Sequence, residues 1–253
     1  MRVQYMSDLH LEFTLNQEYI HDFFEGETGD ILLLAGDIMY LKDSIFIRRR
    51  FLTELSQKYS QVLIVPGNHE FYAYNDIKAY GDSWQIELRP NIHYYYNKVV
   101  HIGDTDFILS TLWSKLDPLQ EKRIQQGMSD FYQIGYNGEW LSPRHYNEEH
   151  ENCVRFIHEA VEKSTAEKIV VVTHHAPSLQ TVAPQHQNSI LRSAFTSDLE
   201  ELIRNSRIDY WVYGHSHTNI DCQVGQTKIV CNQLGYVSSN EHLGFNYNKF
   251  FEI

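Results

Sequence analysis

Five short groups of polar residues could carry out chemistry in this chain, and each of them ends a run of apolar residues. They are Asp8-Leu9-His10, Gly36-Asp37, Gly67-Asn68-His69-Glu70, His174-His175-Ala176-Pro177 and Gly214-His215-Ser216-His217. Metal sites in mixed α/β folds form where strands stop and the backbone turns, because side chains from several strand ends converge there. A pair of divalent ions about 3.5–4 Å apart needs carboxylate, imidazole and amide ligands. Together the five groups predict a two-metal hydrolytic centre.

The spacing inside two of these groups indicates how their side chains would be presented. Asp8 and His10 alternate along the chain, so an extended backbone would place both on one face. The same holds for His215 and His217, where Gly214 would let the backbone turn sharply. Both pairs are therefore expected to direct two ligands at one ion.

The remaining motif residues suggest separate roles. Asp37, behind Gly36 at the end of an apolar run, has the position that a carboxylate bridging two ions needs. If Asn68 points at an ion from an extended backbone, the next side chain projects elsewhere, so His69 is expected to face a substrate. Glu70 is expected to orient a backbone or side-chain partner and not a metal.

Short runs of β-branched and aromatic residues predict the strands that position these groups. They cover residues 3–6, 31–35, 62–65, 107–109, 169–172, 210–213 and 229–231. Helical patterns lie at 44–59, 146–164 and 198–204, and Ser197 with Glu200 forms the expected capping box of the last. The early alternation of strands and helices favours parallel sheet, whereas the C-terminal third is typical of hairpins. A four-layer α/β/β/α sandwich of two mixed β-sheets flanked by helices satisfies both patterns.

The content and order of the five groups resemble those of the calcineurin-like metallophosphoesterase superfamily, from Asp8 to His217. The resemblance implies metal-dependent hydrolysis of a phosphodiester or a phosphomonoester. It also implies a ligand set for two ions: Asp8, His10 and His217 for one, Asn68, His174 and His215 for the other, and Asp37 as the bridge. By the same resemblance, His69 acts beside the phosphate as an acid or a stabiliser of the transition state. The chain departs from the family where Leu11-Glu12 replaces the glycine that often follows the first motif.

Substrate contacts are less sharply indicated. Besides Asn68 and His69, we expect Trp113, which lies just past a strand, to contribute to selectivity. The polar segments 114–143 and 178–195 also follow strands and are expected to cover the substrate. Either histidine of the 174–175 pair could be a ligand. His174 matches the family position, which leaves His175 behind the ligands, facing the substrate, or simply packed.

The predicted donors are oxygen and nitrogen atoms without a thiolate. This set suits Mn, Fe, Zn or Ni better than Mg or Ca, which prefer shells of oxygen alone. Two such ions lower the pKa of a bridging water, so that it acts as hydroxide, and clamp the phosphoryl oxygens. We therefore expect two divalent transition-metal ions as cofactors, with His69 and Asp37 as the catalytic residues.

Composition limits the remaining possibilities. The 253 residues contain no linker-like stretch, which favours one domain over 1–253, and the net charge of −12 makes nucleic acid an unfavoured partner. The three cysteines form no CxxC pair, and no signal peptide or membrane span is evident, so we expect a cytoplasmic protein without a membrane partner. The oligomeric state is open.

Two other functions remain to be separated from a phosphoesterase of small molecules. A binding module of the same fold would have lost ligands or the histidine at position 69, and both are present here. A nuclease would show a basic groove and added interaction segments, and the acidic composition shows neither.

Overall fold

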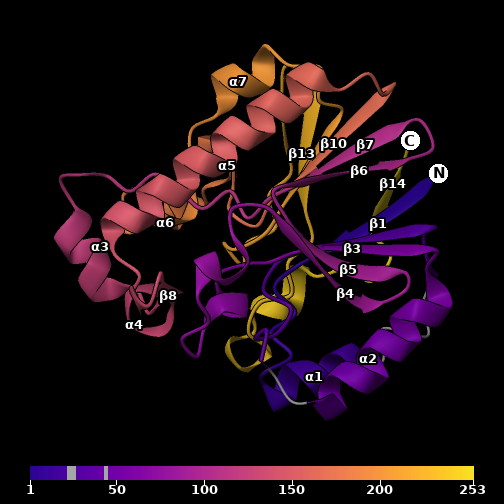
Figure 1. Ribbon diagram of the computed structural model, residues 1–253, viewed down its shortest axis with the longest axis horizontal. Helices are drawn as coiled ribbons and strands as arrows, with labels where there is room; N and C mark the ends of the chain where they lie inside the picture. Colours follow the sequence, from indigo (N-terminus) through magenta and orange to yellow (C-terminus); the bar gives the residue numbers. More distant parts are fainter. Residues whose placement is uncertain (22–26, 43–44) are drawn as a thin grey trace.

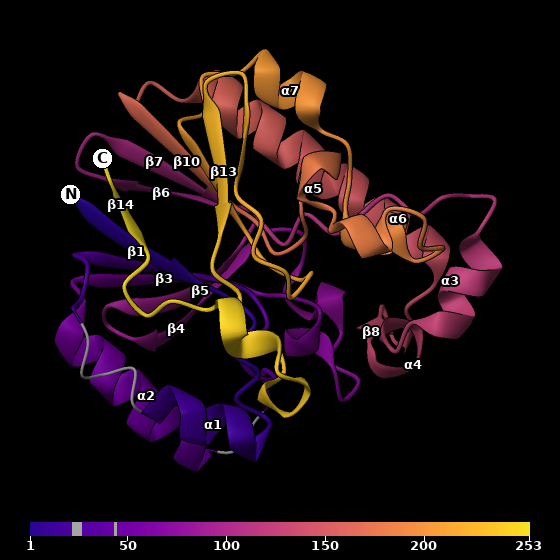
Figure 2. The ribbon, with the colours of Figure 1, turned by 180° about the vertical axis from the view of Figure 1, so that it is seen from behind.

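The structure is a computed structural model, and it describes residues 1–21, 27–42 and 45–253. Ser44, the expected first residue of a helix, lies outside these ranges. The described chain forms two six-stranded sheets that face each other, with helices on both outer faces (Figures 1 and 2). The predicted four-layer α/β/β/α sandwich is thereby confirmed.

Both sheets have four parallel strands in the centre and an antiparallel strand at each edge. The order of the first sheet is β14 (Phe250–Glu252), β1 (Arg2–Met6), β2 (Ile31–Ala35), β3 (Gln61–Val65), β5 (Ile92–Tyr96) and β4 (Trp84–Arg89). The order of the second is β12 (Cys222–Val224), β13 (Thr227–Cys231), β11 (Tyr210–Tyr213), β10 (Lys168–Val172), β7 (Thr105–Leu109) and β6 (Lys98–Ile102).

Alternation along the strands divides the core into layers. In β2, Ile31 and Leu33 pack between the two sheets, whereas Leu32 and Leu34 pack under the helices of the first sheet. All five residues of this strand are buried, as expected for a parallel strand covered on both faces. Each strand predicted from such an apolar run therefore contributes side chains both to the layer between the sheets and to the layer under the helices.

The helices fall into an outer set and a lateral set. α1 (Thr14–His21) and α2 (Ile45–Lys58) cover the first sheet, and α5 (Pro143–Lys163) and α7 (Glu200–Arg204) cover the second (Figure 1). The lateral set lies to one side of the sheets and comprises α3 (Glu121–Gly127), α4 (Asp130–Gln133), the hairpin of β8 (Gly135–Tyr136) and β9 (Glu139–Trp140), and α6 (Arg192–Phe195). Six short 3-10 helices complete the described elements: η2 (His69–Phe71), η3 (Ile77–Tyr80), η4 (Leu179–Thr181), η5 (Pro184–His186), η6 (Val237–Ser239) and η7 (Glu241–Gly244).

The expected capping box of α7 is wrong. The helix begins at Glu200 with Leu199 as its N-cap, and the Asp198 carboxylate, not Ser197, accepts from the Glu200 N–H at 3.3 Å. The Ser197 hydroxyl instead accepts a hydrogen bond from the Lys115 N–H at 3.2 Å, and Glu200 accepts one from the Ser178 hydroxyl at 2.6 Å. The Ser197 hydroxyl and the Glu200 carboxylate, which would have formed the capping box, are thus bonded to residues of other segments.

Candidate metal centre

The seven predicted ligands come together where parallel strands of both sheets end. Asp8, Asp37 and Asn68 follow β1, β2 and β3, while His174 and His215 follow β10 and β11. Carboxylate and imidazole atoms there form groups whose members lie within 4.8 Å of one another. Among the described residues these are Asp8 with His10 and His217, His10 with Asp37 and His69, and Asp37 with His174 and His215.

One end of the cluster is formed by the first and last motifs. Nε2 of His10 lies 3.0 Å from Nε2 of His217, which is also 3.3 Å from Oδ1 of Asp8. Oδ2 of Asp37 lies 3.8 Å from Nε2 of His10. The segments around residues 8 and 217 therefore meet in the fold.

The other end gathers around His174. Its Nε2 lies 3.1 Å from Oδ1 of Asn68, 3.1 Å from Nδ1 of His215 and 3.4 Å from Oδ1 of Asp37. The two carboxylate oxygens of Asp37 thus face different ends of the cluster, one toward His10 and one toward His174. This is the position that the sequence suggested for a bridging carboxylate.

At five of the seven predicted ligands the backbone is left-handed and not extended. The φ angles are 55° at Asp8, 47° at His10, 54° at Asp37, 74° at His215 and 49° at His217. The expectation that alternation along extended segments aligns the two pairs is therefore wrong. Such conformations each cost about 1–3 kcal/mol and persist where the surrounding structure holds them. Aspartate and histidine are among the residues that tolerate them best.

Two glycines allow the loops to approach the ligands closely. A Cβ atom at Gly214 would lie 2.7 Å from Oδ2 of Asp8, and one at Gly67 would collide with Oδ1 of Asp37. The backbone turns sharply after Gly214, as expected, because the Ser216 N–H donates to the Gly214 carbonyl at 3.0 Å and His215 between them has φ 74°. Gly214 itself has no positive φ, so the glycine serves close approach to Asp8. A side chain at either position would therefore force the neighbouring carboxylate or its loop to shift.

Three of the candidate imidazole ligands are held from behind by hydrogen-bond acceptors. Nδ1 of His10 lies 3.0 Å from Oε1 of Glu12, Nδ1 of His217 lies 2.6 Å from Oε2 of Glu241, and Nδ1 of His174 lies 2.8 Å from the carbonyl oxygen of Ala35. A carboxylate or carbonyl oxygen only accepts, so Nδ1 carries the hydrogen in each ring. In the neutral ring, Nε2 is then an acceptor that points into the cluster.

These Nε2 acceptors face other acceptors. The Nε2 atoms of His10 and His217 face each other, and Nε2 of His174 faces the Oδ1 atoms of Asn68 and Asp37. Acceptors at such distances repel one another unless positive charge lies among them. Divalent transition-metal ions fit this set of carboxylate, amide and imidazole donors.

Protonation equilibria divide the four candidate imidazole ligands into two pairs. Burial opposes protonation of His217, but its hydrogen bonds to Asp8 and Glu241 outweigh burial and raise its pKa to about 10. Burial also opposes protonation of His174, yet the Asp37 carboxylate raises its pKa to about 9. Burial prevails at His10 and His215 and lowers the pKa of both, so the carboxylates favour added positive charge at His174 and His217.

His69 faces the pocket from a different backbone than expected. Asn68 has helical angles, φ −74° and ψ −34°, and serves as the N-cap of the 3-10 helix η2 that begins at His69. Nδ1 of His69 lies 2.8 Å from Oε1 of Glu12, and its Nε2 lies 3.4 Å from the Tyr236 hydroxyl and 4.0 Å from Oδ2 of Asp37. Burial lowers the pKa of His69, but Asp37 and Glu12 outweigh it and raise that pKa above its usual value.

Glu70 ties the loop after β2 to the loop after β3. Its Oε2 accepts from the backbone N–H groups of Asp37 at 2.9 Å and Gly67 at 2.7 Å. Its Oε1 accepts from the N–H of Ile38 at 2.8 Å and from the Tyr94 hydroxyl at 3.1 Å. These contacts confirm the prediction that Glu70 orients backbone and side-chain partners.

A pocket of about 320 Å³, here called the site pocket, opens onto the cluster. Besides Asp37, Asn68, His69, His215 and His217, its lining consists of Tyr72, Gly127, Met128, Ser129, Asp130, Leu191, Phe195, Ser216, Tyr236 and Glu241. The polar segments 114–143 and 178–195 both contribute to this wall. They therefore lie where substrate-covering segments were expected.

Four polar residues of the site were not anticipated from the sequence. Glu12 joins His10 to His69, and Glu241 holds His217. Asp130 accepts hydrogen bonds from the Asn68 amide and the Tyr72 hydroxyl, and Tyr236 contacts His69. Of these four, only Glu12 lies close to a predicted motif in the sequence, two residues after His10.

His175 and Trp113 do not reach the site pocket. Both side chains are completely buried. Nε2 of His175 lies 2.9 Å from the Tyr146 hydroxyl, and the Trp113 indole N–H donates to the Tyr96 hydroxyl at 3.2 Å. The structure thus places both behind the ligands, away from any substrate in the pocket.

Comparison with known proteins agrees with this geometry. The family model described as calcineurin-like phosphoesterase matches residues 1–219. An uncharacterized protein, L509, of Acanthamoeba polyphaga mimivirus is 30% identical over 281 residues, covering 100% of this chain and 97% of that protein.

Solved structures share the fold at low identity. The phosphopantetheinyl hydrolase of Mycobacterium tuberculosis aligns with a TM-score of 0.65 and 17% identity, over 100% of this chain and 95% of its own. The protein TT1561 of Thermus thermophilus aligns with a TM-score of 0.50 and 9% identity, over 92% and 88%. The motif order, the two-sheet sandwich and the family match lead to one conclusion: this chain belongs to the calcineurin-like phosphoesterase family.

Proposed function

We propose that this chain hydrolyses a small-molecule phosphate ester with the help of two divalent transition-metal ions (Mn, Fe, Zn or Ni). The observation that carries the proposal is the position of Asp37 between two groups of ligands. Its Oδ1 faces His174 at 3.4 Å and its Oδ2 faces His10 at 3.8 Å. One carboxylate shared between two ions is the arrangement that dinuclear hydrolases use.

The two ligand groups follow the two ends of the cluster. Asp8, His10 and His217 would hold one ion, and Asn68, His174 and His215 would hold the other, with Asp37 shared. When bound, the ion pair activates a water as the nucleophile and neutralises charge on the phosphoryl oxygens.

Among the described residues, the structure contains no helix with the length and apolar character that a membrane span requires.

His69 would protonate the leaving group. Glu12 holds Nδ1 of its ring, so the opposite nitrogen, Nε2, is directed at the site pocket. In the doubly protonated ring, Nε2 donates its proton to the departing oxygen. A well-placed acid contributes about 10²–10⁴-fold to the rate.

The test combines a substrate panel with metal counting. The full chain is loaded separately with each of the four metals, assayed on aryl phosphomonoesters and phosphodiesters, and analysed for bound metal by mass spectrometry. We expect hydrolysis by the wild type, loss of both ions in Asp37→Asn and loss of one ion in Asp8→Asn, because only the bridge holds both. Two ions retained in Asp37→Asn would refute the bridge. A fully loaded wild type that hydrolyses no ester would instead indicate a binding module.

A further inference from the structure

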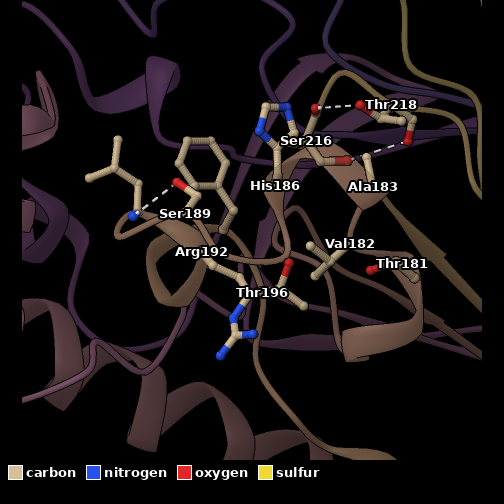
Figure 3. Close-up of a pocket in the computed structure, with 11 residues that line it drawn as sticks. Thr181, Val182, Ala183, His186, Ser189, Arg192, Thr196, Ser216 and Thr218 are labelled. Carbon is tan, nitrogen blue, oxygen red and sulfur yellow. Dashed lines mark hydrogen bonds between the residues drawn. The ribbon is translucent and has the colours of Figure 1, made fainter.

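Figure 3 shows a second pocket, of about 220 Å³, here called the side pocket. It lies between the segment 181–196, which contains η5 and α6, and the turn after β11. Leu191, Phe195 and Ser216 line both pockets. The two spaces therefore share a wall, and a ligand in one can extend into the other past these three residues.

The side pocket differs from the site pocket in charge. The site pocket is lined by the carboxylates of Asp37, Asp130 and Glu241, whereas the described lining of the side pocket contains no carboxylate. Arg192 is the one formally charged residue in the described lining of the side pocket. Its guanidinium N–H donates to the Gln187 carbonyl at 2.9 Å. A lining with a cation and no carboxylate does not suit a metal ion, so the side pocket is not a further metal site.

Its walls are largely apolar. Val182, Ala183, Leu191 and Phe195 supply carbon surface, and Figure 3 shows Val182 and Ala183 on the same side of the pocket. The hydroxyls of Ser216 and Thr218 are directed at the carbonyls of each other's residues, at 3.4 and 3.2 Å. These walls favour an organic group with few polar atoms.

The side pocket joins the cluster at the end away from His69. The ring of Phe195 stacks on His215, with ring centroids 4.5 Å apart and an interplanar angle of 22°. His215 groups with His174 and Asp37, whereas His69 groups with Asp37 and His10. A phosphoryl group bound over Asp37 would therefore have the proton donor on one side and the side pocket on the other.

We propose that the side pocket binds the apolar organic group that stays on phosphorus, so that the preferred substrate is a phosphodiester. This inference rests on the proposed function. Water adds its hydroxyl to phosphorus, the P–O bond to the leaving group breaks, and the leaving oxygen takes a proton and departs as an alcohol. The retained group remains attached in a phosphomonoester product. A phosphomonoester substrate has no such group and leaves the side pocket unused.

Three esters with the same leaving group test this: 4-nitrophenyl phosphate, methyl 4-nitrophenyl phosphate and phenyl 4-nitrophenyl phosphate. With the metal-loaded full chain, we expect kcat/KM for the phenyl diester to exceed that for the methyl diester by at least about tenfold, the size of effect that one apolar group makes in a fitted pocket. Calorimetry should show the same ratio between the Kd values of phenylphosphonate and methylphosphonate, which are not hydrolysed.

Filling the side pocket should remove the preference. Val182→Trp and Ser189→Trp add bulk at two lining positions, so that a fold defect in one leaves the other informative. Leu179→Trp is the matched control, because Leu179 is 40% exposed, lies two residues before this segment and lines neither pocket. We expect both lining variants to bind the two phosphonates equally, with the methyl diester still hydrolysed, and the control to behave as wild type.

The outcomes separate the two proposals. Hydrolysis without a phenyl preference, a preference that survives both lining variants, or a monoester hydrolysed best would overturn the assignment of the side pocket alone. If no ester is hydrolysed with any of the metals, the proposed function fails, and the diester preference fails with it.

Discussion

Replacing Glu70 with glutamine tests whether one buried carboxylate holds two ligand-bearing loops together. Glu70 is completely buried and accepts from the N–H groups of Asp37, Gly67 and Ile38. In the variant one oxygen becomes an NH₂ group. Placing the NH₂ group at the position of Oε1 costs less free energy than placing it at Oε2, because the Tyr94 hydroxyl can turn to accept from it. The Ile38 N–H then faces a donor and loses its partner, as does the Met39 N–H, whose bond to Oε1 is longer at 3.4 Å.

The expected loss can be estimated from these contacts. A hydrogen bond to a charged group contributes about 1.5–3 kcal/mol, and a buried donor left unpaired costs about 1–3 kcal/mol. Glu70→Gln should therefore lower the free energy of unfolding by about 2.5–6 kcal/mol. For a chain of this size each kcal/mol corresponds to about 2–4 °C, so Tm should fall by about 5–24 °C.

Thermal unfolding of the metal-free protein measures this effect without a contribution from metal binding. Burial and the Asp37 carboxylate raise the pKa of Glu70 to about 7, so the measurement belongs above that pH, where the group is ionised. Glu159→Gln makes the same chemical change at an exposed site on α5, where Glu159 pairs with Lys163, and should leave Tm unchanged. Equal Tm values for Glu70→Gln and this control would refute the reasoning.

Three further perturbations follow from the site and the core. His69→Ala should keep both metals yet slow esters of poorly leaving alcohols far more than activated aryl esters, since only the former need a proton; equal losses across leaving groups would contradict this role. Glu12→Gln, which weakens the hold on His10 and His69, should reduce metal affinity or activity by about 10–100-fold in equilibrium dialysis and rate assays, and unchanged values would exclude that hold. Burial raises the pKa of Cys153 and of Cys222 to about 11, and the Cys231 side chain is buried. Maleimide should therefore label the native protein slowly at neutral pH, and mass spectrometry should find all three thiols labelled after unfolding.

Local patterns were sufficient to predict the layers of the fold. Apolar runs such as 31–35 and 169–172 are short, and nearly every residue in them is buried, because the central strands are covered on both faces. Their side-chain alternation assigns each residue to the layer between the sheets or to the layer under the helices. That information is contained in the run itself and needs no distant partner.

The convergence of the seven candidate ligands could also be predicted from the sequence. Each lies within a few residues of a strand end, and parallel strands bring their carboxyl ends to one edge. The backbone around them was not readable. Asp8 N–H donates to the Gly36 carbonyl at 2.9 Å and His10 N–H to the Asp37 carbonyl at 3.0 Å, and these bonds between loops hold the left-handed angles.

Only the tertiary structure decided which residues surround the ligands. Glu241 reaches His217 from a 3-10 helix near the end of the chain, and Asp130 reaches Asn68 from the lateral helices. Trp113 lies beside a strand end, as a substrate contact would, but packing against Tyr146 and Phe71 buries it completely. Contacts between segments far apart in the chain depend on how the loops pack, and no spacing or periodicity within a short stretch encodes that.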